Sequence, residues 1–160
     1  MKKILLFTLI ICTVMSCKKD DNSDPVISST VTCSIDNAAT TFSIANYSIS
    51  DSSIAFANSD ESILFGFMFK KGFPTSFPVS YDSNTDTLVI AIYEANDNDY
   101  IATEIVSDGV QYSWGSYKLT ISNNTDSRIE GTFETTLIDP LGIQDSVVIT
   151  NGVFKNVESD

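Results

Sequence analysis

The chain has 160 residues, with 9 basic and 21 acidic side chains and no histidine. This length suits one domain of ordinary size. The net charge of −12 argues against nucleic-acid binding, because an acidic surface repels phosphate. The lack of histidine excludes Ser-His-Asp and Cys-His catalysis and the usual zinc and iron sites.

The first sixteen residues have the order of a secretory signal. Met1 to Lys3 is a short positive start, Ile4 to Val14 is almost wholly apolar, and the small residue Ser16 precedes Cys17. As a helix, the apolar run would reach about 16 Å, roughly half of the hydrocarbon thickness that a spanning helix must cross. We therefore expect a signal peptide over residues 1–16. The alternative is a buried N-terminal helix.

Val14-Met15-Ser16-Cys17 resembles the lipobox of bacterial lipoproteins. The resemblance implies cleavage before Cys17, lipidation of this cysteine and a firm membrane anchor of several acyl chains. The acidic segment over residues 17–25 is similar to the one that follows the lipid cysteine in surface lipoproteins of the Bacteroidota. This likeness implies an outer-membrane protein exposed on the cell surface, and the alternative is a solvated tether on the periplasmic face.

Removal of the signal peptide leaves seven basic and twenty-one acidic residues, and therefore a net charge of −14. Cys12 leaves with the signal and Cys17 carries lipid, so Cys33 is the one thiol that remains and no intrachain disulfide is expected. Cys33 shares one side of a predicted strand with Val31 and Ile35, where it would pack as a small hydrophobic residue. A reactive or ligating thiol is the alternative.

Apolar and polar residues alternate with period two from Val26 onward, which predicts β-strands. In the clearest strand, Arg128 to Ile138, one side is apolar and buried and the other is solvated. From Ile63 to Phe69 both sides are apolar, with Leu64 and Met68 opposite three Phe residues, which favours a strand covered on both faces. Three further inward rows are predicted: Leu88, Ile90 and Ile92; Ile101, Thr103 and Ile105; and Tyr117, Leu119 and Ile121.

Turn residues separate the predicted strands. They stand at Asp36-Asn37, Asp82 to Asn84, Asn96 to Asp99, Asp108-Gly109, Asn123-Asn124 and Asp139 to Gly142. Within the last strand, Val147 to Val157, the pair Asn151-Gly152 predicts a turn or a bulge. About nine strands without helical periodicity predict one all-β domain over residues 26–160. We expect an antiparallel β-sandwich, with an up-and-down β-barrel as the alternative.

Several short motifs resemble those of a group of small uncharacterised lipoproteins of the Bacteroidota. They are an early hairpin, a mid-chain Phe-Pro segment, a Gly-Thr-Phe strand and a closing Asn-Gly-x-Phe strand: Thr32 to Phe42, Phe77-Pro78 with Tyr81, Gly131 to Phe133, and Thr150 to Phe154. The resemblance implies a shared β fold. It carries no assigned function and no catalytic residues.

Paired carboxylates are the one kind of catalytic site that the composition leaves open, since glycoside hydrolysis needs only two Asp or Glu residues. The candidates on or beside strands are Glu94, Glu104, Glu130 and Glu134. Because Glu130 and Glu134 fall on a face expected to be solvated, a hydrolase is a minor alternative.

Asp82, Asn84 and Asp86 have the spacing of the first three ligands of a Ca²⁺ loop. Thr87 replaces the required Gly and Tyr93 the twelfth-position Glu, so a polar hairpin tip is the favoured interpretation. We expect no metal and no cofactor.

The segment around Tyr112 and Trp114 is the strongest candidate for ligand binding. Strict alternation places both rings outward, about 7 Å apart along a strand, where they could stack on sugars or anchor a protein. A bulge at Gly115 would instead send Trp114 into the core. Phe73, Phe77 and Tyr81 form a second aromatic candidate, with rings folded onto the open end of the sheet as the alternative.

These observations favour a non-enzymatic, lipid-anchored surface module that binds a glycan or a protein partner. The alternative is a structural or accessory envelope lipoprotein without a small ligand.

Overall fold

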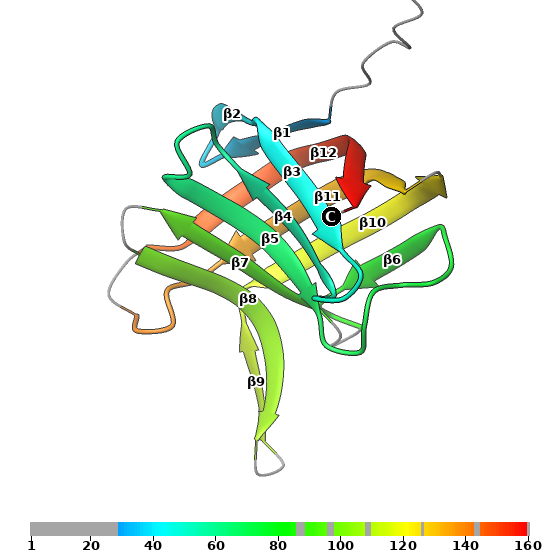
Figure 1. Cartoon of the computed structure of the whole chain (residues 1–160). Coiled ribbons are helices and arrows are strands. Elements are labelled where there is room, and N and C mark those ends of the chain that lie inside the picture. Colours follow the sequence, from blue (N-terminus) through cyan, green and yellow to red (C-terminus); the bar gives the residue numbers. More distant parts are fainter. Residues whose placement is uncertain are drawn as a thin grey trace, which may run out of the picture.

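The computed structural model describes residues 29–85, 89–95, 98–107, 110–125, 127–142 and 145–159. Within these residues there are twelve β-strands and no helix (Figure 1). The strands are β1 Thr30–Ile35, β2 Ala38–Phe42, β3 Ile44–Ser48, β4 Ser53–Ala57, β5 Ile63–Phe69, β6 Val79–Asp82, β7 Val89–Ala95, β8 Asn98–Ser107, β9 Val110–Trp114, β10 Ser116–Thr125, β11 Arg128–Leu137 and β12 Val147–Ser159. The predicted all-β fold is confirmed, with more strands than expected.

The strands form one curled sheet in the order β6-β10-β11-β12-β3-β4-β5-β7-β8-β9, with β1 added to β12 and β2 to β1. Neighbours are antiparallel except for β12 and β3, which pair in parallel through Glu158 and Ser159. The sheet curls into a half-barrel, so that β4, β5 and β7 face β10, β11 and β12 across the core (Figure 1). We call these two sets of strands the first limb and the second limb.

Aromatic rings fill the space between the limbs. Phe56 and Phe65 of the first limb lie 5.6 and 5.1 Å from Phe133 of the second, measured between ring centroids. Phe154 lies 5.8 Å from Phe56. Such distances are typical of favourable aromatic pairs, which add about 0.5–1.5 kcal/mol each beyond the area that they bury.

Most of the predicted inward rows are confirmed. In β11, Ile129, Phe133 and Leu137 are buried, and the row from Tyr117 to Ile121 in β10 is buried as well. The turn at Asp36-Asn37 is also confirmed: both residues have positive φ, 48° and 68°, as a two-residue hairpin of type I′ requires. The last strand contains a bulge at this point instead of a turn: Gly152 pairs with Phe133 of β11, and the two residues before it, Thr150 and Asn151, lie opposite the single residue Glu134.

The predicted inward row of β7 is wrong. Ala91 and Tyr93 are buried, whereas Ile90 and Ile92 lie on the outer face and are half-buried. The reason is the pairing with β5: the fully buried Phe67 lies opposite Ala91 and occupies the core there, so the small side chain fits inside. Leu88, from the same predicted row, lies outside the described residues.

The prediction for β8 is wrong at Ile101. Ile101 pairs with Ile92 on the outer face, and Ala102 is the fully buried residue. Thr103 is buried too, so alternation is interrupted where β8 curves out of the sheet to pair with β9 (Figure 1). The side chain of Ile105 lies outside the described part of the chain.

The turn expected at Asn123-Asn124 is wrong as well. The backbone of β10 continues to Thr125, which pairs with Arg128 of β11. The extra residue of a bulge is Ser122, and Asn123 and Asn124 pair with Glu130 and Ile129, so pairing with β11 outweighs the preference of asparagine for turns.

Candidate functional site

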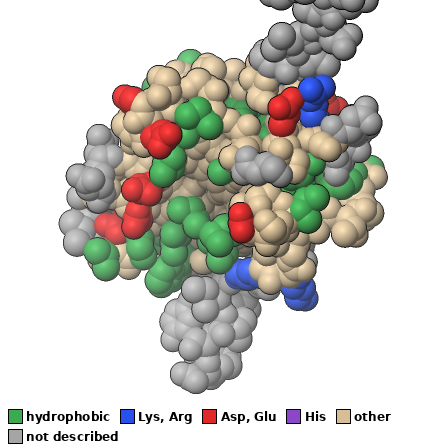
Figure 2. All heavy atoms as spheres, viewed as in Figure 1, with side chains coloured by type: hydrophobic (Ala, Val, Ile, Leu, Met, Phe, Trp, Pro, Cys, Tyr) green, Lys and Arg blue, Asp and Glu red, His purple; other side chains and the backbone are tan. Residues whose placement is uncertain are grey.

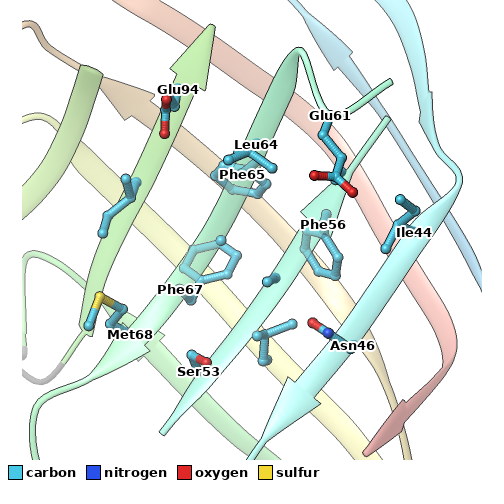
Figure 3. A pocket seen from close by; sticks show the side chains of 15 residues that line it. Ile44, Asn46, Ser53, Phe56, Glu61, Leu64, Phe65, Phe67, Met68 and Glu94 are labelled. Carbon is cyan, nitrogen blue, oxygen red and sulfur yellow. The ribbon is translucent and has the colours of Figure 1, made fainter. Parts of the chain in front are cut away.

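A groove of about 400 Å³ lies on the outer face of β3, β4, β5 and β7 (Figure 3). Its centre is hollow because small residues meet there: Ala55 of β4 pairs directly with Gly66 of β5. Larger residues flank this pair in the same row, Asn46 on β3 and Ile92 on β7. Side chains on one face of a sheet stand side by side across strands. Two small side chains between two larger ones therefore leave a depression.

Exposed aliphatic side chains line the groove around its hollow centre. Ile44, Leu64 and Met68 are 42, 40 and 46 % exposed, and they make up half of the large hydrophobic side chains that are exposed among the described residues. Figure 2 views this face and shows hydrophobic side chains gathered on it, with acidic ones along one edge. Contiguous apolar surface with a polar rim is typical of interaction sites.

One end of the groove is acidic. Glu61, from the turn before β5, and Glu94, from β7, lie on either side of Leu64 (Figure 3). Asp99 of β8 pairs directly with Glu94. Like charges that face each other across strands destabilise a sheet, so a cation at this end would be favourable.

Gly66 has no room for a side chain. A Cβ atom built there would lie 2.5 Å from the carbonyl oxygen of Ile54, in the neighbouring strand. The hollow is therefore a fixed property of the backbone, and any residue other than glycine would disturb the pairing of β4 with β5.

Sequence reasoning missed this groove, although its signal was present. The aliphatic outer face of β5, with Leu64 and Met68, favoured a strand covered on both sides. In the described residues, the inner side is covered by the core and the outer side is the groove. The strand register is needed to assign three further residues to the groove: Glu61, Ala55 and Ile44.

Of the two residues of the predicted aromatic platform, the structure describes the side chain of Trp114 alone. Trp114, the last residue of β9, is half-buried and pairs through its backbone with Thr103. Gly115 has a φ of +65° and interrupts the alternation between β9 and β10, as the predicted bulge would. The side chain of Tyr112 lies outside the described residues, so the platform stays a prediction.

The second aromatic candidate packs inward. Phe73 is buried, with its ring 5.0 Å from Tyr47 and 5.2 Å from Phe69. The ring of Tyr81 lies 5.4 Å from Phe69. Phe77 packs partly buried against the same core, so these rings cover the open end of the sheet.

Asp82 and Asn84 form a local turn. Asp82 Oδ1 accepts hydrogen bonds from the backbone N–H and the side-chain amide of Asn84, at 2.9 and 2.8 Å. The backbone hydrogen bond is the main cause that lowers the pKa of Asp82. Asp86 lies outside the described residues. In the described part of the chain, no three His, Cys, Asp or Glu residues are grouped to hold a metal ion.

The predicted carboxylates are not brought together. Glu94 lies at the groove on the first limb, whereas Glu130 and Glu134 lie on the solvated face of β11 in the second limb. The side chain of Glu104 is outside the described residues. Glu61 and Glu94 border the same groove, on either side of Leu64 (Figure 3).

Cys33 packs in the core as predicted. It is 6 % exposed, and burial raises the pKa of its thiol to about 11, so the thiol is protonated and unreactive at neutral pH. Cys17, the predicted lipidation site, lies outside the described residues.

Searches of protein-family models, curated proteins and solved structures found no match to this chain. The described residues include no helix of the length and apolar character that crossing a membrane requires.

Proposed function

We propose that this chain is a lipid-anchored envelope protein whose β domain is a non-enzymatic binding module, and that the groove is its binding surface for a protein partner. The apolar segment before Cys17 and the lipobox resemblance support the anchor. The acidic segment after Cys17 favours the outer membrane and the cell surface over the periplasmic face.

One observation carries the binding role. Strands β5 and β7 are apolar on both faces, and the described residues cover only the inner face of each strand. Phe65 and Phe67 face the core, while Leu64 and Met68 remain exposed. Strands that are apolar on both faces are typically covered on both faces. A partner on the outer face would complete this arrangement.

The chemistry of the groove favours protein over glycan. Its outward side chains are aliphatic, small, polar or acidic, and the Phe residues beneath it point into the core. Sugar rings are commonly held by stacking on exposed aromatic rings. Aliphatic contact with a charged rim is instead typical of protein interfaces.

The experiment is site-specific photo-crosslinking in cells that express the full chain. A photoreactive residue replaces Met68, in the groove, or Val148, which is similarly exposed at 39 % but lies on the second limb. A discrete protein adduct at Met68 that is absent at Val148 supports the proposal. Equal adducts at both positions, or none at Met68, would overturn it.

A further inference from the structure

The first limb is flanked by acidic residues at one end and by two lysines at the other. Glu61 and Glu94 lie at the end where β5 begins. Lys70 and Lys71 directly follow the last residue of β5 at the other end, where the turn between β3 and β4 also carries Asp51. All three are exposed, and Lys70 also has an interaction within its own chain. Among the described residues, no Lys or Arg forms an ion pair with Glu61, Glu94 or Asp99.

The same face carries both a knob and a hollow. Met68 is 46 % exposed and pairs with Ser53 across β4, one row beyond the Ala55–Gly66 hollow. A surface with a knob beside a hollow, and with acidic and basic ends, is complementary to itself when one copy is turned end over end. Self-complementarity of this kind is what a twofold interface requires.

We propose that the groove binds a second copy of this chain, with the two outer faces packed against each other and β5 crossing β5 in opposite directions. This inference rests on the proposed function, because it names the protein partner of the same groove. A twofold axis across the strands at the level of Phe67 places Met68 of each copy over Gly66 of the other.

The same axis also pairs the charges. On β5, two residues face each other across the axis when their numbers add up to 134, which is twice the number of Phe67. Lys70 of one copy therefore lies at the level of Leu64 of the other. Leu64 pairs with Glu94, which places Lys70 beside the acidic end. On β7, Ile90 of one copy lies over Ile92 of the other, because these residues pair with Met68 and Gly66.

The interface is small. Four strands of five to seven residues span roughly 19 Å by 20 Å, or about 380 Å² per copy, which is below the roughly 800 Å² of a standard interface. We therefore expect weak association in solution. Anchoring both copies in one membrane would favour the dimer by raising their effective concentration.

The test extends the crosslinking experiment to cells that express two differently tagged copies of the full chain. If the inference holds, the adduct at Met68 has twice the mass of the chain and contains both tags. A Met68 adduct with a different protein would overturn the inference and leave the proposed function standing. No adduct at Met68 would overturn both.

Two sets of variants sharpen this test. Ala55→Leu fills the hollow and should lower the dimer adduct at least fivefold, whereas Ala39→Leu, the same change on exposed β2, should not.

Lys70→Glu or Glu94→Lys alone should lower the adduct, and the two combined should restore it. Lys155→Glu, exposed on β12, is the control for charge reversal. Failure of the combined variant to restore the adduct would overturn the proposed pairing.

Discussion

Ala55 and Gly66 face each other across β4 and β5, and together they form the hollow of the groove. The two positions differ in how they tolerate a larger side chain. Ala55 is exposed and projects into the hollow, whereas a Cβ at Gly66 would collide with the carbonyl oxygen of Ile54. The groove can therefore be filled from one side without disturbing the sheet.

We expect Gly66→Ala to lower the free energy of unfolding by about 1–3 kcal/mol, the usual cost of overpacking. Ala55→Leu should change it by no more than about 0.5 kcal/mol, as is normal for an exposed position. Urea unfolding of both variants measures the difference. Equal stability of the two variants would contradict the conclusion that a larger side chain has room at position 55 and none at position 66.

Two glycines of the second limb make room for aromatic rings. A Cβ at Gly152 would meet the ring of Phe133, and one at Gly131 would meet the ring of Phe154. Gly152 pairs with Phe133, and Gly131 pairs with Phe154, in adjacent strands. The Gly-Thr-Phe and Asn-Gly-x-Phe motifs thus fit each other across β11 and β12.

We therefore expect Gly152→Ala to be strongly destabilising while Phe133 is present, by about 1–3 kcal/mol. In a Phe133→Ala background, which itself costs about 3–5 kcal/mol, the added effect of Gly152→Ala should largely disappear. A double-mutant cycle by chemical unfolding measures this coupling. Additive effects would show that ring contact is not the reason for glycine at this position.

The sequence predicted buried rows well where the two faces of a strand differ in polarity. In β11, acidic and Thr side chains alternate with apolar ones, so only one side can face the core. In β7 both faces are apolar, and alternation does not say which is inside. The pairing of Ala91 with Phe67 decides this, and it depends on strand register over long range.

The groove could not be predicted for the same reason. Ala55 and Gly66 are eleven positions apart in the chain, and nothing local indicates that they share a row. Glu61 and Glu94 border the same groove only because β5 pairs with β7. Contacts between strands, and the hollows that they leave, are set by register, which the sequence pattern did not resolve.

The proposed lipid anchor makes a prediction about two cysteines. Cys17→Ala should abolish incorporation of labelled palmitate and release the chain from the membrane fraction, because several buried acyl chains supply the anchoring free energy. Cys33→Ala is the matched control and should leave both unchanged, since Cys33 is buried in the core. Retention of label in Cys17→Ala would contradict lipidation at this residue.

The buried thiol of Cys33 should make stability depend on alkaline pH. Burial raises its pKa from 9.0 to about 11, so below pH 9 the thiol is protonated in both the folded and the unfolded chain. Between pH 9 and 11 the unfolded chain loses the proton and the folded chain keeps it. The free energy of unfolding should then fall by up to about 2–3 kcal/mol.

Tyr93, whose pKa is raised mainly by burial, acts in the same direction. Urea unfolding at several pH values should show a shallower decline in Cys33→Ala than in the wild type, with the remaining slope due to Tyr93 and other groups. An unchanged slope would mean that the Cys33 thiol ionises as readily in the folded protein as in the unfolded chain.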